Sequence, residues 1–165
     1  MSALAKGSSA PRFELPDLSG GRYTFDGTRN VVLAFFKISC PTCQYTFPFL
    51  ERLYQNKVKG HESAIELVGI SQDDAASTRD FIGRYGITFP VLLDEAPKYT
   101  VSNAYGLTNV PTLYLICGDG GVEWSSVGWS RDDMEDLNAR ISNLTDATPV
   151  PLFQPGDNVV QFKAG

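Results

Sequence analysis

A pair of cysteines stands where an apolar run gives way to a helical pattern, and this juncture limits the possible fold most. The motif Cys40-Pro41-Thr42-Cys43 follows the run 31–36, which is entirely apolar, after three intervening residues. Six residues are too few for a helix, so we predict a buried central strand there. The sequence therefore predicts a strand that delivers both sulfurs to the N-terminus of a helix.

That placement gives the two cysteines different chemistry. Unpaired N–H groups and the helix dipole favour a negative charge at a helix N-terminus. Such an environment lowers a thiol pKa from about 8.5 into roughly the 3.5–7.5 range. Pro41 suits the first helical position, where its missing N–H costs nothing. We expect Cys40 to cap the helix as the exposed, attacking thiolate, and Cys43 to face inward and resolve the mixed disulfide.

Other interpretations of the cysteines remain open. The pair could be half of a zinc site, which would have to recruit Cys117 and the single histidine, His61, or it could be two inert core thiols. Cys117 lies in an apolar run and is expected to be a buried small hydrophobe rather than a redox group. Lys37 could lower the pKa of Cys40, or it could be an ordinary solvated lysine.

Hydrophobic periodicity and turn residues predict the other elements. We expect extended segments at residues 13–15, 22–25, 65–70, 88–94, 112–117 and 122–127, and helices over residues 44–58, 77–85 and 97–105 and after Ser130. Pro48 is expected to kink the first helix, Gly86 to end the second and Ser130 to cap the last. The alternation predicts a mostly parallel central sheet with helices on both faces and an antiparallel edge from the closing hairpin.

Length and composition limit the organisation. The chain has 165 residues, which favours one domain. We expect a flexible N-terminal segment at 1–10, a domain at 11–144 and a proline-containing tail at 145–165. The tail is expected either to lie over the domain as an arm or to be partly disordered.

Charge and cysteine usage narrow the classes of partner and location. The net charge of −5 disfavours nucleic acid or an anionic membrane as a partner, and three cysteines are too few for a secreted disulfide framework. No secretory h-region or apolar stretch of about 18–20 residues is visible. We therefore expect a cytoplasmic location, or a periplasmic one if a leader was trimmed. No metal, flavin or nucleotide site is visible, since residues 118–121 form a hairpin turn rather than a phosphate loop.

Several separate motifs, in this order, resemble the thioredoxin superfamily, and the redoxin branch most. That branch includes peroxiredoxins and the thiol reductants of cytochrome c maturation, and the resemblance runs from about residue 11 to 144. The matching pieces are residues 11–18 followed by Gly20 and Gly21, the Cys40–Cys43 motif, Pro48, residues 68–71, residues 89–91 with Asp94, residues 104–106, and Val110-Pro111-Thr112.

The resemblance implies a thioredoxin-like fold, in which helices flank a central mixed β-sheet. Along the chain, an N-terminal β-hairpin leader comes first and an extended C-terminal tail comes last. It implies a cis Pro111 packed against the cysteine pair and a Val110 backbone that pairs with an extended substrate segment. Pro41 and Thr42 would complete the substrate contacts. The implied activity is thiol–disulfide exchange with disulfide-containing proteins, and it requires no cofactor. An electron donor of unknown identity would complete the cycle. The implied biological role is redox homeostasis or antioxidant defence.

The sequence departs from the peroxiredoxin pattern. Peroxiredoxins carry a proline seven residues and a threonine or serine three residues before the peroxidatic cysteine. Counted back from Cys40 these positions hold Leu33 and Lys37, and counted back from Cys43 they hold Phe36 and Cys40. No arginine replaces Val110 or Pro111. A thiol peroxidase is therefore kept as the alternative function.

The acid/base residues of related reductants are also replaced. Thioredoxins carry an aspartate where this chain has Ala34, and a tryptophan where it has Ser39. Reductants of cytochrome c maturation tend to carry a glutamate at the place of Thr46. The proton acceptor is therefore unassigned; water could serve, or a carboxylate from elsewhere in the chain, with Glu51 as one candidate. A second alternative follows, namely a redoxin-fold binding module whose cysteines are not catalytic.

Overall fold

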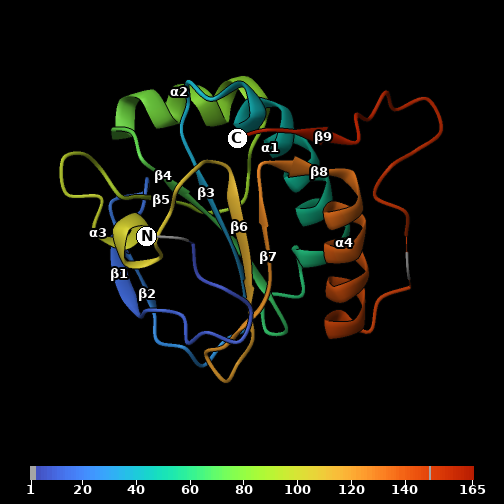
Figure 1. Ribbon diagram of the computed structural model, residues 1–165, viewed down its shortest axis with the longest axis horizontal. Coiled ribbons are helices and arrows are strands. Elements are labelled where there is room, and N and C mark those ends of the chain that lie inside the picture. The colour runs from blue at the N-terminus through green and yellow to red at the C-terminus, as the bar shows by residue number, and fades with distance from the viewer. Residues whose placement is uncertain (1–2, 149) are drawn as a thin grey trace.

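A central β-sheet forms the middle layer of the molecule (Figure 1). The computed structural model describes residues 3–148 and 150–165. Met1, Ser2 and Pro149, which belong to the expected N-terminal segment and tail, lie outside the described residues.

In the described part of the chain the central sheet has five strands in the order β5-β4-β3-β6-β7. Their bounds are Val91–Leu93, Glu66–Ser71, Val31–Phe36, Thr112–Ile116 and Val122–Val127. β3 pairs in parallel with β4 and antiparallel with β6. β4 pairs in parallel with β5, and β6 antiparallel with β7. The sheet is thus mixed, as the resemblance implied, rather than mostly parallel, because the closing hairpin pairs directly with the central strand.

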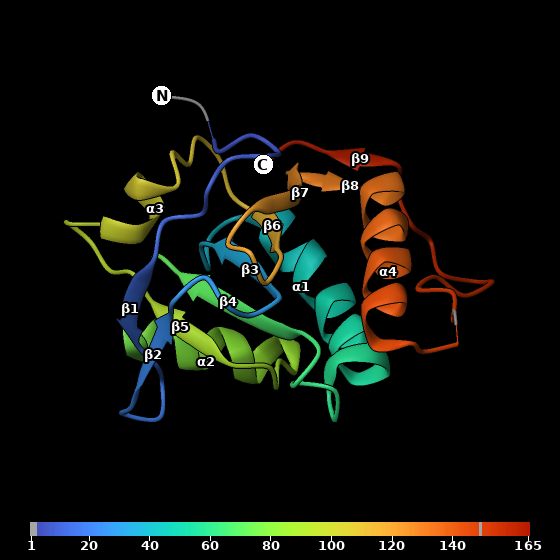
Figure 2. The same ribbon diagram turned by 90° about the horizontal axis from the view of Figure 1, so that it is seen from below.

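Helices cover both faces of this sheet. The core on one face includes residues from α1 (Pro41–Leu53), α2 (Ala75–Tyr85) and α4 (Arg131–Thr145). The other face is covered by α3 (Thr100–Ala104) and the hairpin of β1 (Phe13–Pro16) and β2 (Arg22–Phe25). Figure 2 shows α1 and α4 on one side of the sheet and α3 with β1 on the other. The six residues of β3 are fully buried because successive side chains enter opposite cores.

Capping residues account for most helix ends. Ser130 accepts the N–H of Asp133 at 3.2 Å and begins α4, and Gly86 ends α2 with a φ of 67°. The predicted helix over residues 44–58 is present, but it begins at Pro41 and its last five residues, Tyr54–Val58, form a π-helix. Pro48 lies inside α1, and the kink expected there stays a prediction.

The helix expected over residues 97–105 is shorter, since α3 begins at Thr100. Tyr99 adopts a left-handed conformation with a φ of 42°, which breaks the helix there. The buried carboxylate of Asp94 accepts the N–H groups of Val101 and Ser102 at 3.2 and 2.7 Å. These bonds satisfy the first free donors of α3 and fix its start.

The tail is an arm laid over the domain, one of the two forms expected for it. After α4 it loops outward and returns as β9 (Phe162–Lys163), which pairs antiparallel with β8 (Trp129–Ser130) (Figure 1). At the other terminus, backbone hydrogen bonds join Gly7 to Val122 and Ala10 to Gly120, both at 2.8 Å. Hydrogen bonds do not measure motion, so the flexibility of residues 1–10 stays a prediction. Across the described residues, every helix is too short or too polar to cross a bilayer.

Candidate active site

Cys40 lies at the N-terminus of α1, four residues beyond the end of β3. It has an extended backbone (φ −82°, ψ 113°) and caps the helix, and Pro41 takes the first helical position. The Cys40 sulfur accepts the N–H of Cys43 at 3.1 Å. No acidic residue occupies the first turn of α1, so the positive end of the helix dipole acts on this sulfur without a competing local carboxylate on the helix.

Cys43 faces the core one turn further on. Its side chain is fully buried, whereas Cys40 is only partly buried, and both are free thiols. Burial, and next the contact with the Cys40 side chain, raise the pKa of the Cys43 thiol above its ordinary value. The two sulfurs therefore lie next to each other with the asymmetry in exposure that the sequence predicted.

The segment before β6 meets the pair from the neighbouring strand. The Val110–Pro111 peptide bond is cis, as the resemblance implied. The thiol of Cys40 donates to the Val110 carbonyl oxygen at 3.4 Å. Thr112 steadies this corner because its hydroxyl donates to the Asn109 carbonyl at 2.7 Å. Residues 70 positions apart in sequence thus meet at the end of β3.

The other two predicted substrate contacts, Pro41 and Thr42, differ from each other in exposure. Pro41 is exposed, but Thr42 is buried with 5% of its surface accessible. The Thr42 hydroxyl donates to the Ala164 carbonyl at 2.6 Å, and the Asn109 side-chain amide donates to the Gly165 carbonyl at 3.4 Å. The end of the tail therefore lies over the helix start, which sequence reasoning did not predict.

Lys37 and Asp73 flank the turn that leads into Cys40. The Lys37 carbonyl accepts the Cys40 N–H at 3.3 Å, and its ammonium lies 5.9 Å from the centre of the Tyr99 ring. The effect of Lys37 on Cys40 stays a prediction. Asp73, which sequence reasoning missed, accepts the Ile38 N–H at 2.8 Å. Its position just after β4 was a usable signal, because the carboxyl ends of parallel neighbours share one sheet edge.

Glu51 is too far away to be the proton acceptor suggested for Cys43. It lies eight residues further along α1, which is about 12 Å of helix. Its carboxylate accepts the N–H and the hydroxyl of Thr88 at 2.7 and 2.6 Å. Thr46 is buried and donates to the Thr42 carbonyl at 2.7 Å. Neither side chain is placed to take a proton from Cys43.

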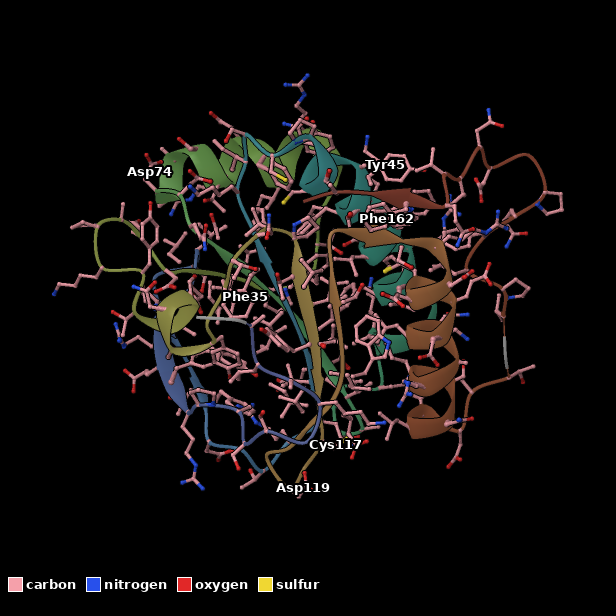
Figure 3. All side chains as sticks on the ribbon, in the orientation of Figure 1. Phe35, Tyr45, Asp74, Cys117, Asp119 and Phe162 are labelled. Atoms are coloured by element: carbon pink, nitrogen blue, oxygen red, sulfur yellow. The ribbon has the colours of Figure 1, made fainter. Side chains whose placement is uncertain are left out.

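The partners that a zinc site would need lie at the other end of the sheet. Cys117 follows the far end of β6, about 20 Å from Pro111 at strand rise. It is partly exposed rather than buried as expected, because it lies just beyond the end of the strand. Figure 3 shows it beside the turn of Asp119, opposite the end that carries Tyr45 and Phe162. His61 precedes β4, whose start lies beside the start of β3. Cys117 and His61 therefore cannot join Cys40 and Cys43 around one ion.

Fold and site together define a class of protein. Helices on both sides of a mixed sheet, a Cys-Pro-Thr-Cys motif at a helix N-terminus and a cis-proline beside it are the features of a thioredoxin-fold redox protein. The model of the AhpC/TSA family matches residues 6–125. The chain belongs to this family.

Relatives with assigned activities agree with this class. The chain is 31% identical to the thiol-disulfide oxidoreductase ResA of Geobacillus kaustophilus, over 81% of this chain and 76% of that one. It is 32% identical to ResA of Bacillus subtilis, over 80% and 73% of the two chains. The fold alone is also shared with the thioredoxin domain of a thiol-disulfide oxidoreductase from Bacteroides vulgatus, which superposes with a TM-score of 0.71 at 21% identity and covers 84% of this chain and 98% of that one. The prediction of a thiol-disulfide oxidoreductase is confirmed.

Proposed function

We propose that Cys40 and Cys43 carry the exchange reaction and that the substrates are disulfide-containing proteins. The observation that supports this most is the asymmetry of the pair. Cys40 is partly exposed and its sulfur accepts a helix N-terminal N–H at 3.1 Å, while Cys43 is fully buried behind it. One sulfur can meet an outside disulfide, and the other can reach only the first.

The reaction proceeds in two balanced steps. The Cys40 thiolate attacks one sulfur of a substrate disulfide, a Cys40–substrate bond forms, and the second substrate sulfur leaves as a thiolate that takes a proton. Cys43 then loses its proton and attacks the Cys40 sulfur. The Cys40–Cys43 disulfide forms, the substrate departs as a dithiol, and two electrons have passed to it. A separate dithiol donor must return the protein to its reduced state.

Substrate binding depends on the backbone of the Val110–Pro111 segment, just before β6. The Val110 carbonyl lies 3.4 Å from the Cys40 sulfur, so a peptide backbone that pairs with Val110 would bring its disulfide next to Cys40. Asn109 and Val110 also line a surface cavity of about 200 Å³ together with Lys37 and Gln72. This cavity offers room for a substrate side chain beside the reacting sulfur.

Reduction of insulin disulfides with dithiothreitol as the electron donor tests the assignment. We expect Cys40→Ser to abolish the catalysed rate, because Cys43 is buried and no accessible thiol remains at the start of α1. Cys43→Ser should accumulate a mixed disulfide on Cys40 that intact-mass analysis detects. Cys117→Ser, a cysteine change at the far end of the sheet, is the matched control and should keep the wild-type rate.

Two results would contradict the proposal. Insulin reduction that survives Cys40→Ser would remove Cys40 from the first step. Single-turnover peroxide consumption that survives Cys43→Ser, with no insulin reduction by the wild type, would instead favour a thiol peroxidase.

A further inference from the structure

The last residues of the tail lie across the place where the proposed function needs a substrate. We call Phe162–Gly165 the strap. Its Ala164 carbonyl accepts the Thr42 hydroxyl at 2.6 Å, and its Gly165 carbonyl accepts the Asn109 amide at 3.4 Å. The strap therefore contacts both the first turn of α1 and the segment before Pro111, from either side of Cys40.

Among the residues of the strap, Gly165 packs most tightly against the backbone of Val110. A Cβ atom added to Gly165 would clash with the Val110 carbonyl oxygen and lie 3.1 Å from its carbonyl carbon. Only a residue without a side chain fits there. The Val110 carbonyl is thus enclosed by the Cys40 thiol and by the backbone of Gly165. A second backbone cannot occupy the same side of Val110 while the strap is in place.

The strap is anchored upstream but is itself weakly held. Upstream, the Trp129 indole donates to the Val160 carbonyl at 2.7 Å, and Arg52 pairs with Asp157 at 2.7 Å. The strand pairing of the strap covers the two residues of β9, and beyond it the strap accepts the hydrogen bonds of Thr42 and Asn109 described above. Phe162 is 64% exposed and so adds little burial. This combination permits the strap to leave while the rest of the tail stays attached.

We propose that the strap is an intramolecular occupant of the substrate groove, which an extended protein substrate must displace before Cys40 can react with it. This inference rests on the proposed function, because it assumes that substrates pair with Val110. A small aromatic disulfide needs only the partly exposed Cys40 sulfur. The strap therefore selects substrates by size and by the energy available for displacing it.

Deletion of Phe162–Gly165 tests the strap directly. Two disulfides are compared for each protein, insulin and the small reagent 5,5′-dithiobis(2-nitrobenzoic acid). While the strap occupies the groove, only the fraction of molecules with an open groove can bind insulin. Deleting the strap raises the apparent affinity for insulin by the inverse of that fraction, so we expect the insulin rate to rise about threefold to tenfold. The rate with the small disulfide should change less than about twofold, because the reaction does not require the groove to be open.

A point substitution covers the case in which the deletion does not fold. Gly165→Ala forces a Cβ against the Val110 carbonyl and should raise the insulin rate in the same direction. Gly83→Ala is the matched control, since Gly83 lies in α2 with nothing within 4 Å of the added Cβ. It should leave both rates unchanged.

An insulin rate that stays level or falls in Gly165→Ala, and in the deletion where it folds, would overturn the strap proposal. A fall would mean that the strap helps to bind substrate. The proposed function is judged separately, by Cys40→Ser in the full chain. If that variant still reduces insulin, the proposed function fails whatever the strap variants do.

Discussion

The two thiols of the site differ because one helical turn separates a capping position from a core position. Cys40 ends the extended backbone and shows part of its side chain to solvent, while Cys43 is packed among the side chains of the α1 face. Burial raises the pKa of Cys43, so at neutral pH this residue carries its proton. The second step therefore requires the deprotonation of Cys43.

We accordingly predict a pH-dependent second phase in the reaction of the reduced protein with 5,5′-dithiobis(2-nitrobenzoic acid). Cys40 releases the first nitrothiobenzoate and Cys43 the second. Below the raised pKa of Cys43, its thiolate fraction grows about tenfold for each pH unit, and the second phase should accelerate accordingly. Stopped-flow absorbance measures both phases in a Cys117→Ser background. A second phase that is independent of pH would contradict this prediction.

Asp73 provides a variant that moves this profile. Its charge contributes to raising the pKa of Cys43, and its carboxylate holds the Ile38 N–H at 2.8 Å. Asp73→Asn keeps an acceptor for Ile38 but removes the charge, so the second phase should become about threefold faster at a given pH. Asp73→Ala removes both and serves as the control for the lost hydrogen bond. A slower second phase in Asp73→Asn would identify Asp73 as the proton acceptor instead.

Among the elements, the strong periodic segments and their caps could be predicted from the sequence. The apolar run of β3, the Ser130 cap and the Gly86 end each follow from a local rule. The start of α3 could not, because it depends on Asp94, which lies outside the helical pattern and bonds to Val101 and Ser102. Local periodicity does not contain such contacts between segments.

The path of the tail depends on an aromatic cluster at Trp129. This side chain is fully buried, lies 4.9 Å from the ring of Tyr45 and 5.9 Å from that of Phe153, and donates to the Val160 carbonyl. It therefore joins α1, β8 and the tail. The proline-containing tail has no helical periodicity, so the sequence left open whether it lies over the domain as an arm or is partly disordered.

We predict that Trp129→Ala lowers the free energy of unfolding by about 3–5 kcal/mol, the range for truncating a large buried aromatic side chain. Urea denaturation followed by circular dichroism measures the change. Trp129→Phe keeps one ring but loses the bond to Val160 and the packing of the second ring, so it should cost less than Trp129→Ala, about 1–3 kcal/mol. A loss below about 1 kcal/mol in Trp129→Ala would show that the cluster does not anchor the tail.

For the whole molecule, topology gathers the site from four distant stretches of chain. The end of β3, the end of β4, the start of β6 and the end of the tail meet at one edge of the sheet. The cysteine motif and its place at a helix N-terminus predicted the contribution of Cys40, and the resemblance predicted that of Val110. Asp73 could have been placed from strand order, but the contact of Ala164 with Thr42 could not, because it is set by tertiary packing alone.

The reduction potential of the Cys40–Cys43 couple tests the central claim most directly. The protein is equilibrated in glutathione buffers of known ratio, its free thiols are alkylated, and its peptides are mapped by mass. We predict one two-electron transition between about −270 and −120 mV, in which Cys40 and Cys43 are protected together while Cys117 stays free. A pair that never links at any ratio, or a disulfide that includes Cys117, would contradict the account.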